Sequence, residues 1–490
     1  MTPMSDRVTI LLGPPGTGKT TTCIEYIEKA LESGVAPDKI AYLTFTRKAA
    51  REAVDRACKK FNLTPKDFPY FRTLHSLAYY LLGLNKDDVM SQRNLVELGE
   101  ELGLVFTNKK QPIYERYEYT NGSGDKCMGL YALSRAKRTD ILSEWQQRDF
   151  PDLEFYEVEK FVKAMEDFKK RTYLLDFSDF LDKAMGKVLN VEVAIVDEAQ
   201  DLTRQQWEFC RQLLKNTNKI IIAGDDDQAI FEWAGSDTNT FLNLKGSKQV
   251  LPISYRLPQT VFNLANDIVS KIKHRYTKQW KPRDELGSVN WWGNDPSQGI
   301  EIGQGSWLML ARHAYQLQDY EKICRDNGIV YRYEGEWSNQ TEAVKAVRYY
   351  ERIRRGEPIE SYAIKTIAKY VDVKFEKLKS YTWDSVNWSF EGRPDWMTAL
   401  TRLSMEDREY IRILRRKGIS LTEPGNTIIS TIHGSKGGEA DNVLLRTDYG
   451  KKVREIFESG ETDPEFRVWY VGVTRAKQAL HIYGEKDFVV

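Results

Sequence analysis

A glycine-rich stretch near the amino terminus, LLGPPGTGKTTT, has the residue types and spacing of a phosphate-binding loop: Gly13-x4-Gly18-Lys19-Thr20 closes an apolar run. A strand that ends in glycines and opens into a helix directs backbone N–H groups at one point, where the helix dipole also favours an anion. A plain Gly-Pro turn before a helix would not need all three elements in this order. We therefore predict triphosphate binding, with Lys19 against the β- and γ-phosphates and the Thr20 hydroxyl on Mg²⁺. The loop residues expected to contact the nucleotide are Gly13, Pro14, Pro15, Gly16, Thr17, Gly18, Lys19, Thr20 and Thr21.

Two adjacent acids, Asp197 and Glu198, follow a β-branched run over residues 191–196. Carboxylates at the end of a strand can divide the work of phosphoryl transfer. We expect Asp197 to hold Mg²⁺ through water and Glu198 to polarise the water that attacks the γ-phosphate. Solvated acids after a buried strand are the alternative, which a neighbouring phosphate-binding loop makes less plausible.

A third polar group follows the next apolar run, in the stretch GDDDQAIFEW over residues 224–233. Here Gln228 would lie where a γ-phosphate ends, and the two aromatic residues Phe231 and Trp233 come within five positions of it. One short stretch is therefore predicted to contact the nucleotide at one end and to present flat rings at the other.

Length and charge limit the class of protein. The chain has 490 residues, and its 72 Lys and Arg nearly balance its 71 Asp and Glu. A nucleic-acid surface must then be a local patch. The five cysteines are dispersed, which favours a reducing compartment and argues against structural zinc. No apolar run approaches the roughly 20 residues of a membrane helix, so we expect a cytoplasmic protein with no membrane partner.

The elements that position these residues alternate between strand and helix. We expect strands over residues 7–12 and 40–45, with helices over 20–33 and 47–61. This alternation is typical of a parallel sheet with ligands at the carboxyl ends of its strands. Helical periodicity replaces it from about residue 81 to residue 167, which we interpret as a mainly α-helical insertion. Sheet strands return at residues 191–196 and 219–223.

The second half repeats this pattern. We predict further strands at residues 250–254, 306–311, 426–431, 442–446 and 479–483, and assign them to a second sheet. A helical stretch between them contains Trp383, Trp388 and Trp396 and is interpreted as a second insertion. The expected domains are residues 1–80 and 168–249 for the first α/β domain with the insertion 81–167, and residues 250–333 and 422–490 for the second with the insertion 334–421.

Six motifs now occur in a recognisable order: GPPGTGKT, VDEAQD, GDDDQAIFEW, SYRLPQ, STIHGSKGGEADNV and VWYVGVTRAKQAL. Together they resemble the helicase motifs of superfamily 1, and most of all those of the UvrD/Rep/PcrA type. The resemblance covers residues 11–483 and implies an α/β protein with two RecA-like parallel-sheet motor domains, each carrying a mainly α-helical insertion. The short interval between SYRLPQ and STIHGSKGG implies a compact member, of bacterial or phage origin.

The same resemblance implies roles around the nucleotide. Tyr255 matches the aromatic residue that stacks on the adenine, and Arg256 matches an arginine finger from the second motor domain. Arg475 matches the second finger, and Glu439 matches the acid that contacts the ribose. Guanidinium groups stabilise transition-state charge only when the cleft between two domains is shut, so hydrolysis would be coupled to domain motion. A surface ion pair is the ordinary alternative for any one arginine.

It also implies a track for single-stranded DNA. Stacking of bases on aromatic rings is worth about 1–3 kcal/mol per base and tolerates any sequence. For Phe231, packing in the core remains an alternative to DNA contact. For His75, the alternative is a structural role as a hydrogen-bonded histidine. The residues that match the DNA-contacting motifs are Phe45, Thr46, Arg72, His75, Phe231, Trp233 and His433.

A basic and aromatic segment, KIKHRYTKQWKPR over residues 271–283, fits backbone neutralisation combined with ring contacts. A helix end with a solvated face fits it nearly as well. The resemblance assigns no role to its residues.

Taken together, the sequence predicts an ATP-dependent DNA helicase that uses ATP and Mg²⁺ and translocates on single-stranded DNA, in the 3′ to 5′ direction by resemblance. Its expected partners are single-stranded DNA and junctions of duplex with single strand. We expect a monomer and leave accessory protein partners open. One alternative is a DNA-stimulated ATPase that strips proteins from DNA without unwinding it. Another is a P-loop kinase that binds no polymer, and RNA remains open as the polymer.

Overall fold

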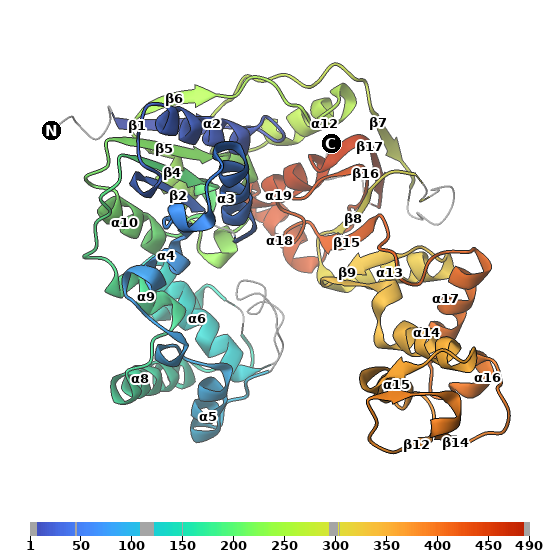
Figure 1. Cartoon of the computed structure of the whole chain (residues 1–490). Coiled ribbons are helices and arrows are strands. Elements are labelled where there is room, and N and C mark those ends of the chain that lie inside the picture. Colours follow the sequence, from blue (N-terminus) through green and yellow to red (C-terminus); the bar gives the residue numbers. More distant parts are fainter. Residues whose placement is uncertain are drawn as a thin grey trace. The chain divides into compact units, whose positions relative to one another are not determined.

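The structure is a computed structural model, and it describes residues 7–44, 47–107, 122–148, 150–293, 302 and 304–484. The chain forms two compact units. The first comprises Met1–Arg256 together with Ile272–Arg283, and the second comprises Leu257–Lys271 with Asp284–Val490. Each unit is described by itself below, with the element labels of Figure 1.

The first unit is built on a six-stranded sheet in the order β3-β2-β4-β5-β1-β6. Every neighbouring pair in it is parallel. Parallel neighbours need crossover connections, which the helices between the strands supply. The strands are β1 (Val8–Leu12), β2 (Ile40–Thr44), β3 (Phe71–Thr73), β4 (Val193–Asp197), β5 (Lys219–Gly224) and β6 (Ser247–Val250).

Alternate residues of these strands face opposite layers of helices. The even positions Ile10 and Ile222 lie in a core with α4, α9 and α10. The odd positions Leu11 and Ile221 lie in a second core with α2 and α3. Because successive side chains of a strand point to opposite faces, apolar residues at both parities bury both faces of the sheet. The helices are α2 (Lys19–Glu32), α3 (Arg47–Phe61), α4 (Leu74–Leu81), α9 (Phe177–Lys183), α10 (Arg204–Leu213) and α11 (Thr238–Leu242).

The predicted first insertion is mainly helical in its described part. It has its own core, in which Leu130 of α6 and Phe161 of α8 are buried. Gly99 and Gly124 are required where the Phe106 ring packs, because a Cβ at either position would lie 2.6 or 2.5 Å from that ring. The helices are α5 (Gln92–Leu102), α6 (Ser123–Lys137), α7 (Ile141–Gln146) and α8 (Phe155–Thr172).

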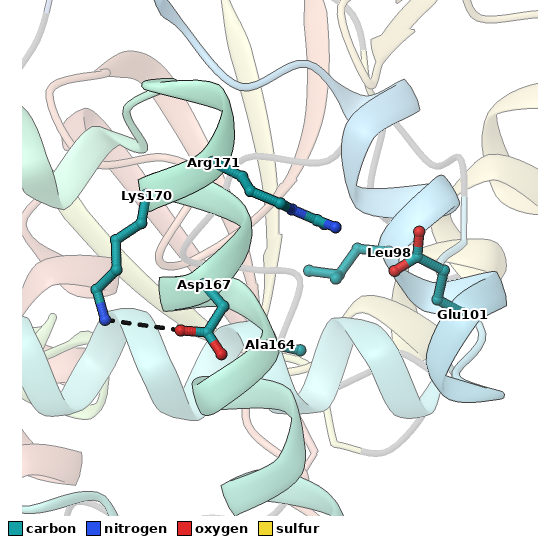
Figure 2. A pocket seen from close by; sticks show the side chains of 6 residues that line it. All are labelled: Leu98, Glu101, Ala164, Asp167, Lys170 and Arg171. Carbon is teal, nitrogen blue, oxygen red and sulfur yellow. Dashed lines mark ion pairs between the residues drawn. The ribbon is translucent and has the colours of Figure 1, made fainter.

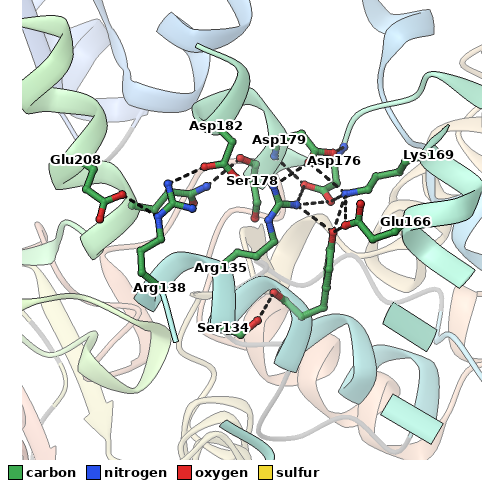
Figure 3. Close-up of polar contacts among 12 residues, drawn as sticks. Ser134, Arg135, Arg138, Glu166, Lys169, Asp176, Ser178, Asp179, Asp182 and Glu208 are labelled. Atoms are coloured by element: carbon green, nitrogen blue, oxygen red, sulfur yellow. Dashed lines mark hydrogen bonds and ion pairs between the residues drawn. The ribbon is translucent and has the colours of Figure 1, made fainter. Parts of the chain in front are cut away.

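A network of ion pairs fastens the insertion to the sheet-bearing part of its unit (Figure 3). Arg135 of α6 contacts three carboxylates, Asp176 at 3.0 Å, Asp179 at 2.8 Å and Asp182 at 2.6 Å. Burial opposes the ionised carboxyl of Asp179, but hydrogen bonds and the cations of Arg135 and Lys169 hold its pKa below the usual value. The ends of helices α6, α8 and α9 are thereby held together by ion pairs, in which each charge compensates the burial of its partners.

The second unit has a seven-stranded sheet in the order β10-β9-β15-β8-β16-β17-β7. Only the β9–β10 hairpin is antiparallel. One face packs on α13 and α17, where Met309 and Tyr320 are fully buried. Helices α12 and α19 pack on each other and contact β7, β16 and β17. The strands are β7 (Ser288–Trp291), β8 (Trp307–Ala311), β9 (Tyr331–Tyr333), β10 (Glu336–Trp337), β15 (Thr427–Thr431), β16 (Ala440–Arg446) and β17 (Ala476–Tyr483), and the helices are α12 (Gln259–Ser270), α13 (Leu317–Asp326), α17 (Met405–Arg416), α18 (Lys451–Ser459) and α19 (Asp463–Val473).

The stretch predicted as a second insertion forms a core of its own around stacked tryptophans. Trp383 and Trp388 stack with ring centroids 4.7 Å apart, and Trp396 is 5% exposed. The stretch is not purely helical, because two small antiparallel sheets accompany its helices. Its elements are α14 (Glu342–Arg354), β11 (Ile359–Glu360), α15 (Ser361–Ile367), β12 (Val373–Phe375), β13 (Ser380–Tyr381), β14 (Val386–Trp388) and α16 (Trp396–Ala399).

One predicted strand was wrong. Residues 250–254 do not form a strand of the second sheet; the strand is β6, Ser247–Val250, and it pairs with β1 in the first sheet. The polar residues Ser247 and Lys248 hid an edge strand from the apolar pattern.

Within the described ranges, no helix combines the length and the apolar character needed to cross a bilayer.

Candidate nucleotide and DNA site

The glycine-rich turn between β1 and α2 has a backbone shape that two of its glycines make possible. Gly16 and Gly18 adopt the left-handed backbone conformation, with φ of 69° and 82°. Thr17 Oγ1 donates to the carbonyl of Pro14 at 2.8 Å and closes the turn. Helix α2 begins at Lys19 without an acidic residue in its first turn, so the positive end of its dipole is not neutralised locally. The turn therefore suits an anion.

Lys19 lies inside this turn. Its Nζ donates to the carbonyl of Gly13 at 3.0 Å and lies 3.9 Å from Glu198 Oε1. A Cβ at position 13 would lie 1.9 Å from the Lys19 Cγ, so only glycine lets the lysine cross the turn. The ammonium group is consequently held beside the N–H groups of the turn, where a phosphate would need it.

Asp197, the last residue of β4, is buried and accepts two hydrogen bonds. Tyr42 donates its hydroxyl to one carboxylate oxygen, and the Glu198 N–H donates to the other at 2.9 Å. Burial, with the neighbouring charge of Glu198, raises the pKa of Asp197 to about 6. A carboxylate with so little compensating positive charge fits a bound cation, because a divalent ion would supply the missing charge. Glu198 itself has a left-handed backbone, with φ of 53°, an uncommon conformation for a residue with a side chain.

Gln200 links this motif to the next. Its Nε2 donates to Glu198 at 2.6 Å, and its Oε1 accepts from the N–H of Asp225 at 3.0 Å. Gln228 lies three residues further, buried, and donates its Nε2 to the Asp225 carboxylate at 2.7 Å. The predicted catalytic pair Glu198 and Gln228 is thus joined through two side chains at the ends of β4 and β5.

The SYR segment lies directly on the glycine-rich turn, within the same unit. Ser254 Oγ donates to the carbonyl of Pro15 at 2.7 Å, and the Tyr255 N–H donates to the carbonyl of Gly16 at 2.8 Å. The Tyr255 side chain is 74% exposed, and its ring approaches to 3.9 Å of the Cβ position of Gly18. An exposed ring at the rim of a phosphate loop is suited to stack on a base. Arg256 also reaches the turn, since a Cβ on Gly16 would lie 2.3 Å from the Arg256 Cβ.

The two remaining nucleotide candidates lie together in the second unit. Arg475 is 1% exposed and donates to the carbonyls of Val471 at 2.9 Å and Gly438 at 3.2 Å. Glu439, next to Gly438, is exposed and lies 3.8 Å from Lys477. The finger and ribose-contacting candidates are therefore neighbours.

One predicted DNA contact, Arg72, lines a groove between α3, β3 and α4. Arg72 anchors there, with its Nε donating to the carbonyl of Pro69 at 2.7 Å and its guanidinium 4.6 Å from the Tyr80 ring. Burial lowers the pKa of His75 to about 4, so this histidine is neutral at physiological pH and can approach a phosphate only as a neutral donor. The groove is lined by Ala50, Arg51, Val54, Asp55, Pro65, Phe71, Arg72, Thr73 and Ser76.

The other predicted DNA contacts are less uniform. Phe231 is 8% exposed, which fits the core-packing alternative, whereas Trp233 is only partly buried and accepts a bond at its carbonyl from Arg148 at 3.2 Å. His433 is partly buried in the turn after β15. Phe45 and Thr46 lie outside the described residues.

A second hollow lies on the insertion, between α5 and α8 (Figure 2). It is lined by Leu98, Glu101, Ala164, Asp167, Lys170 and Arg171, and an ion pair of 3.6 Å joins Lys170 to Asp167 at its rim. None of the predicted site residues lines it.

Comparison with known families agrees with this geometry. The UvrD/REP helicase N-terminal domain matches residues 2–249, and the UvrD-like helicase C-terminal domain matches residues 150–486. The chain belongs to the UvrD-like helicase family. The two parallel sheets of this UvrD-like chain are its two RecA-like domains.

Relatives of the UvrD-like chain carry helicase names. It is 23% identical over 361 residues to the ATP-dependent DNA helicase PcrA of Bacillus subtilis, covering 67% of this chain but only 46% of the length of PcrA. It is 21% identical over 596 residues to a probable DNA helicase II homolog of Rickettsia felis. That alignment covers 96% of this chain and 89% of the relative. The crystal structure of Arterivirus nonstructural protein 10 (helicase) aligns with a TM-score of 0.38 at 12% identity, over 98% of this chain and 61% of that one. A TM-score that low supports no inference.

Sequence reasoning missed two side chains of the nucleotide site and misread a third. Tyr42 stands in a buried apolar strand, so nothing in the pattern distinguishes its hydroxyl from that of a core tyrosine. Gln200 belongs to the VDEAQD motif, and its place two residues after Glu198 was the available signal. In the basic segment, neither predicted alternative holds for Lys278, whose side chain is completely buried.

Proposed function

We propose that the chain is an ATP-dependent DNA helicase that translocates on single-stranded DNA, 3′ to 5′, and couples ATP hydrolysis to strand separation. One observation carries the proposal: residues of four motifs far apart in the sequence are linked around the glycine-rich turn. Lys19 of the turn lies 3.9 Å from Glu198, which is joined to Gln228 through Gln200 and Asp225. The Cβ of Arg256 lies close to Gly16 of the same turn. A lysine, a base candidate, an amide and an arginine are the groups that phosphoryl transfer needs.

Each residue has a defined part in hydrolysis. Lys19 and the N–H groups of the turn bind the β- and γ-phosphates, and Tyr255 stacks on the base. Thr20 and Asp197 are the residues that would hold Mg²⁺, which neutralises charge on the phosphates. Glu198 orients and deprotonates the attacking water, and Gln228 contacts the γ-phosphate. Arg256 and Arg475 are the proposed fingers, and Glu439 the contact to the ribose.

The polymer is proposed to be single-stranded DNA and its junctions with duplex. The basic groove beside Arg72 supports phosphate contacts, and the partly buried Trp233 supports base stacking. We propose a monomeric cytoplasmic protein, and its five dispersed cysteines fit a reducing compartment.

The test is unwinding of labelled duplexes with a 3′ or a 5′ single-stranded tail, in the presence of ATP. We expect release of the strand from the 3′-tailed duplex only, and no release by Lys19→Ala or Glu198→Gln. ATP turnover stimulated by DNA, without strand release from either substrate, would replace the proposal by the protein-stripping translocase. Turnover that DNA does not stimulate would favour the kinase, and retained turnover in both variants would refute the assigned chemistry.

A further inference from the structure

The basic segment at residues 271–283 does not behave as its composition predicts. From Ile272 to Arg283 it belongs to the first compact unit, although the helix just before it, α12, belongs to the second. The Lys278 side chain within it is 0% exposed. A lysine without contact to water cannot reach a DNA phosphate, so its role lies inside the protein.

Lys278 ends among three consecutive carboxylates of the GDDDQ stretch. Its Nζ lies 2.9 Å from Asp225 Oδ1, 2.7 Å from Asp226 Oδ1 and 2.7 Å from Asp227 Oδ2. Arg275 adds a two-pronged contact to Asp227, at 2.7 and 2.6 Å. The Tyr276 N–H donates to Asp226 at 2.8 Å. Three buried acids are therefore met by two cations and one backbone donor from a single short segment.

The electrostatics show that Lys278 governs the charge state of this cluster. Burial favours neutral carboxyls, yet the ammonium of Lys278 holds the pKa of Asp225 below its usual value. The pKa of Asp226 stays raised, by burial and by the charges of its two neighbours. The pKa of Lys278 is raised despite its burial, because the three carboxylates outweigh the loss of water. Without this ammonium, burial and mutual repulsion would disfavour the ionised forms of Asp225 and Asp226 more strongly, although Tyr276 and Arg275 would still contact Asp226 and Asp227.

The cluster leads directly to the nucleotide site. Asp225 presents one oxygen to Lys278 and accepts the Gln228 Nε2–H at the other, at 2.7 Å. Its own N–H donates to Gln200, which in turn holds Glu198. The position of Asp225 thus fixes the Gln228 amide, and Lys278 fixes the position of Asp225.

Three residues later, the same segment holds the other side of the site. The Lys281 N–H donates to the carbonyl of Pro252 at 2.8 Å, and the Lys281 carbonyl accepts from the Ser254 N–H at 2.9 Å. Ser254 then donates its hydroxyl to Pro15 in the glycine-rich turn. One segment therefore connects the stretch that bears Gln228 with the turn that bears Lys19.

We propose that Lys278 is a positioning residue for recognition of the γ-phosphate, acting through Asp225 on Gln228. This inference rests on the proposed function, because it assumes that Gln228 contacts the γ-phosphate. Lys278 touches no nucleotide; it sets the direction of an amide that does. Its loss would weaken the distinction between a nucleoside triphosphate and a diphosphate more than it weakens nucleotide binding as such.

The test compares affinities for a non-hydrolysable ATP analogue and for ADP, by fluorescence titration of the full chain without DNA. In Lys278→Met we expect the ratio of the affinity for the ATP analogue to the affinity for ADP to fall about tenfold. This is the effect of losing one well-placed charged hydrogen bond. Affinity for ADP should change less than threefold. Lys281→Met is the matched control, since this side chain is exposed on the same segment, and its preference should equal that of the wild type. An unchanged preference in folded Lys278→Met would overturn the inference.

A double-mutant cycle with Gln228→Ala separates positioning from mere support of the fold. If Lys278 acts through Gln228, Lys278→Met should change the preference less than twofold once Gln228 is already alanine. A further tenfold loss in the double variant would overturn the inference. Should Lys278→Met fail to fold, the same cycle can be measured with Asp225→Asn. This substitution removes the carboxylate that joins Lys278 to Gln228, and it leaves Lys278 paired with Asp226 and Asp227. An unchanged preference in that variant would also overturn it. Failure of helicase function appears separately, as loss of unwinding by the wild-type chain.

Discussion

Replacing Asp197 by asparagine should make the nucleotide-free protein more stable and inactive at once. The carboxyl is 1% exposed, and its pKa is raised from an ordinary value of about 4 to about 6. Ionisation of this group at neutral pH therefore opposes folding by about 3 kcal/mol, because each pKa unit corresponds to about 1.4 kcal/mol. Asparagine keeps both hydrogen bonds, since its oxygen can accept from the Glu198 N–H and its amide can donate to the Tyr42 oxygen.

The pH dependence follows from the same shift. A carboxyl with a raised pKa in the folded state binds its proton more tightly when folded, so the penalty on the wild type is fully present above pH 6. It shrinks as the pH falls from about 6 towards the unfolded value near 4, where the carboxyl is protonated in the folded protein. The stability advantage of Asp197→Asn should therefore be about 3 kcal/mol at pH 8 and below about 1 kcal/mol at pH 4.

The assay is thermal unfolding of both proteins at pH 8, 6 and 4 without nucleotide, followed by circular dichroism. At pH 8 the melting temperature of the variant should rise by a few degrees, the shift expected for a unit of this size. Asp167→Asn is the control, because this carboxylate on α8 is 60% exposed and its replacement should change stability by less than about 0.5 kcal/mol. Equal or lower stability of Asp197→Asn at pH 8, or an advantage that does not depend on pH, would refute the reasoning. Addition of ATP with Mg²⁺ should stabilise the wild type more than the variant.

The remaining predictions concern the DNA track and the insertion. Trp233→Ala should weaken binding of single-stranded DNA by about 1–3 kcal/mol, measured by fluorescence anisotropy, while ATP turnover without DNA stays within about twofold; unchanged binding would show that the ring only packs in the core. Arg135→Met should destabilise the first unit by about 2–3 kcal/mol, because three acids lose a charged hydrogen-bond donor. The loss is limited because Lys169 still pairs with Asp176 and Asp179, and Arg138 with Asp182. Urea unfolding measures this loss, with Arg56→Met, an exposed helix pair, as the control expected to change little. Equal effects of the two arginines would contradict the structural role of the network.

The parts of the fold that the sequence predicted are those with a local signal. The strands β1, β2, β4 and β5 begin and end within about two residues of the predicted ranges, because each is a short, mostly apolar run; glycine or acidic residues mark the ends of β1, β4 and β5. The helix from Arg47 to Phe61 was predicted with its observed bounds. The edge strand β6 was not, because half of its residues are polar and exposed and carry no such run.

The candidate site divides in the same way. The positions of Lys19, Asp197 and Glu198 were predictable because the backbone itself places them, after the carboxyl ends of β1 and β4 in one parallel sheet. Tyr42 was not, since its role depends on which residue of β4 lies beside β2, a register that only the pairing of the two strands decides. The roles proposed for the DNA contacts rest on the family resemblance. The Phe231 ring is buried, as the apolar Ile-Phe pair in the sequence already suggested.

Lys278 shows why burial of charge is the hardest property to derive from a sequence. The basic segment and the acidic GDDD stretch each look solvated when considered alone, because isolated charges are rarely buried. The two segments are some 50 positions apart, and their charges neutralise each other. Burial is possible only when the two sets of charges are paired. Such a pair costs desolvation energy that an apolar contact would not, so its presence beside Gln228 is better explained by the direction it imposes on a polar side chain than by stability. Substitution of the whole cluster by apolar residues should then preserve the fold better than it preserves the preference for a triphosphate.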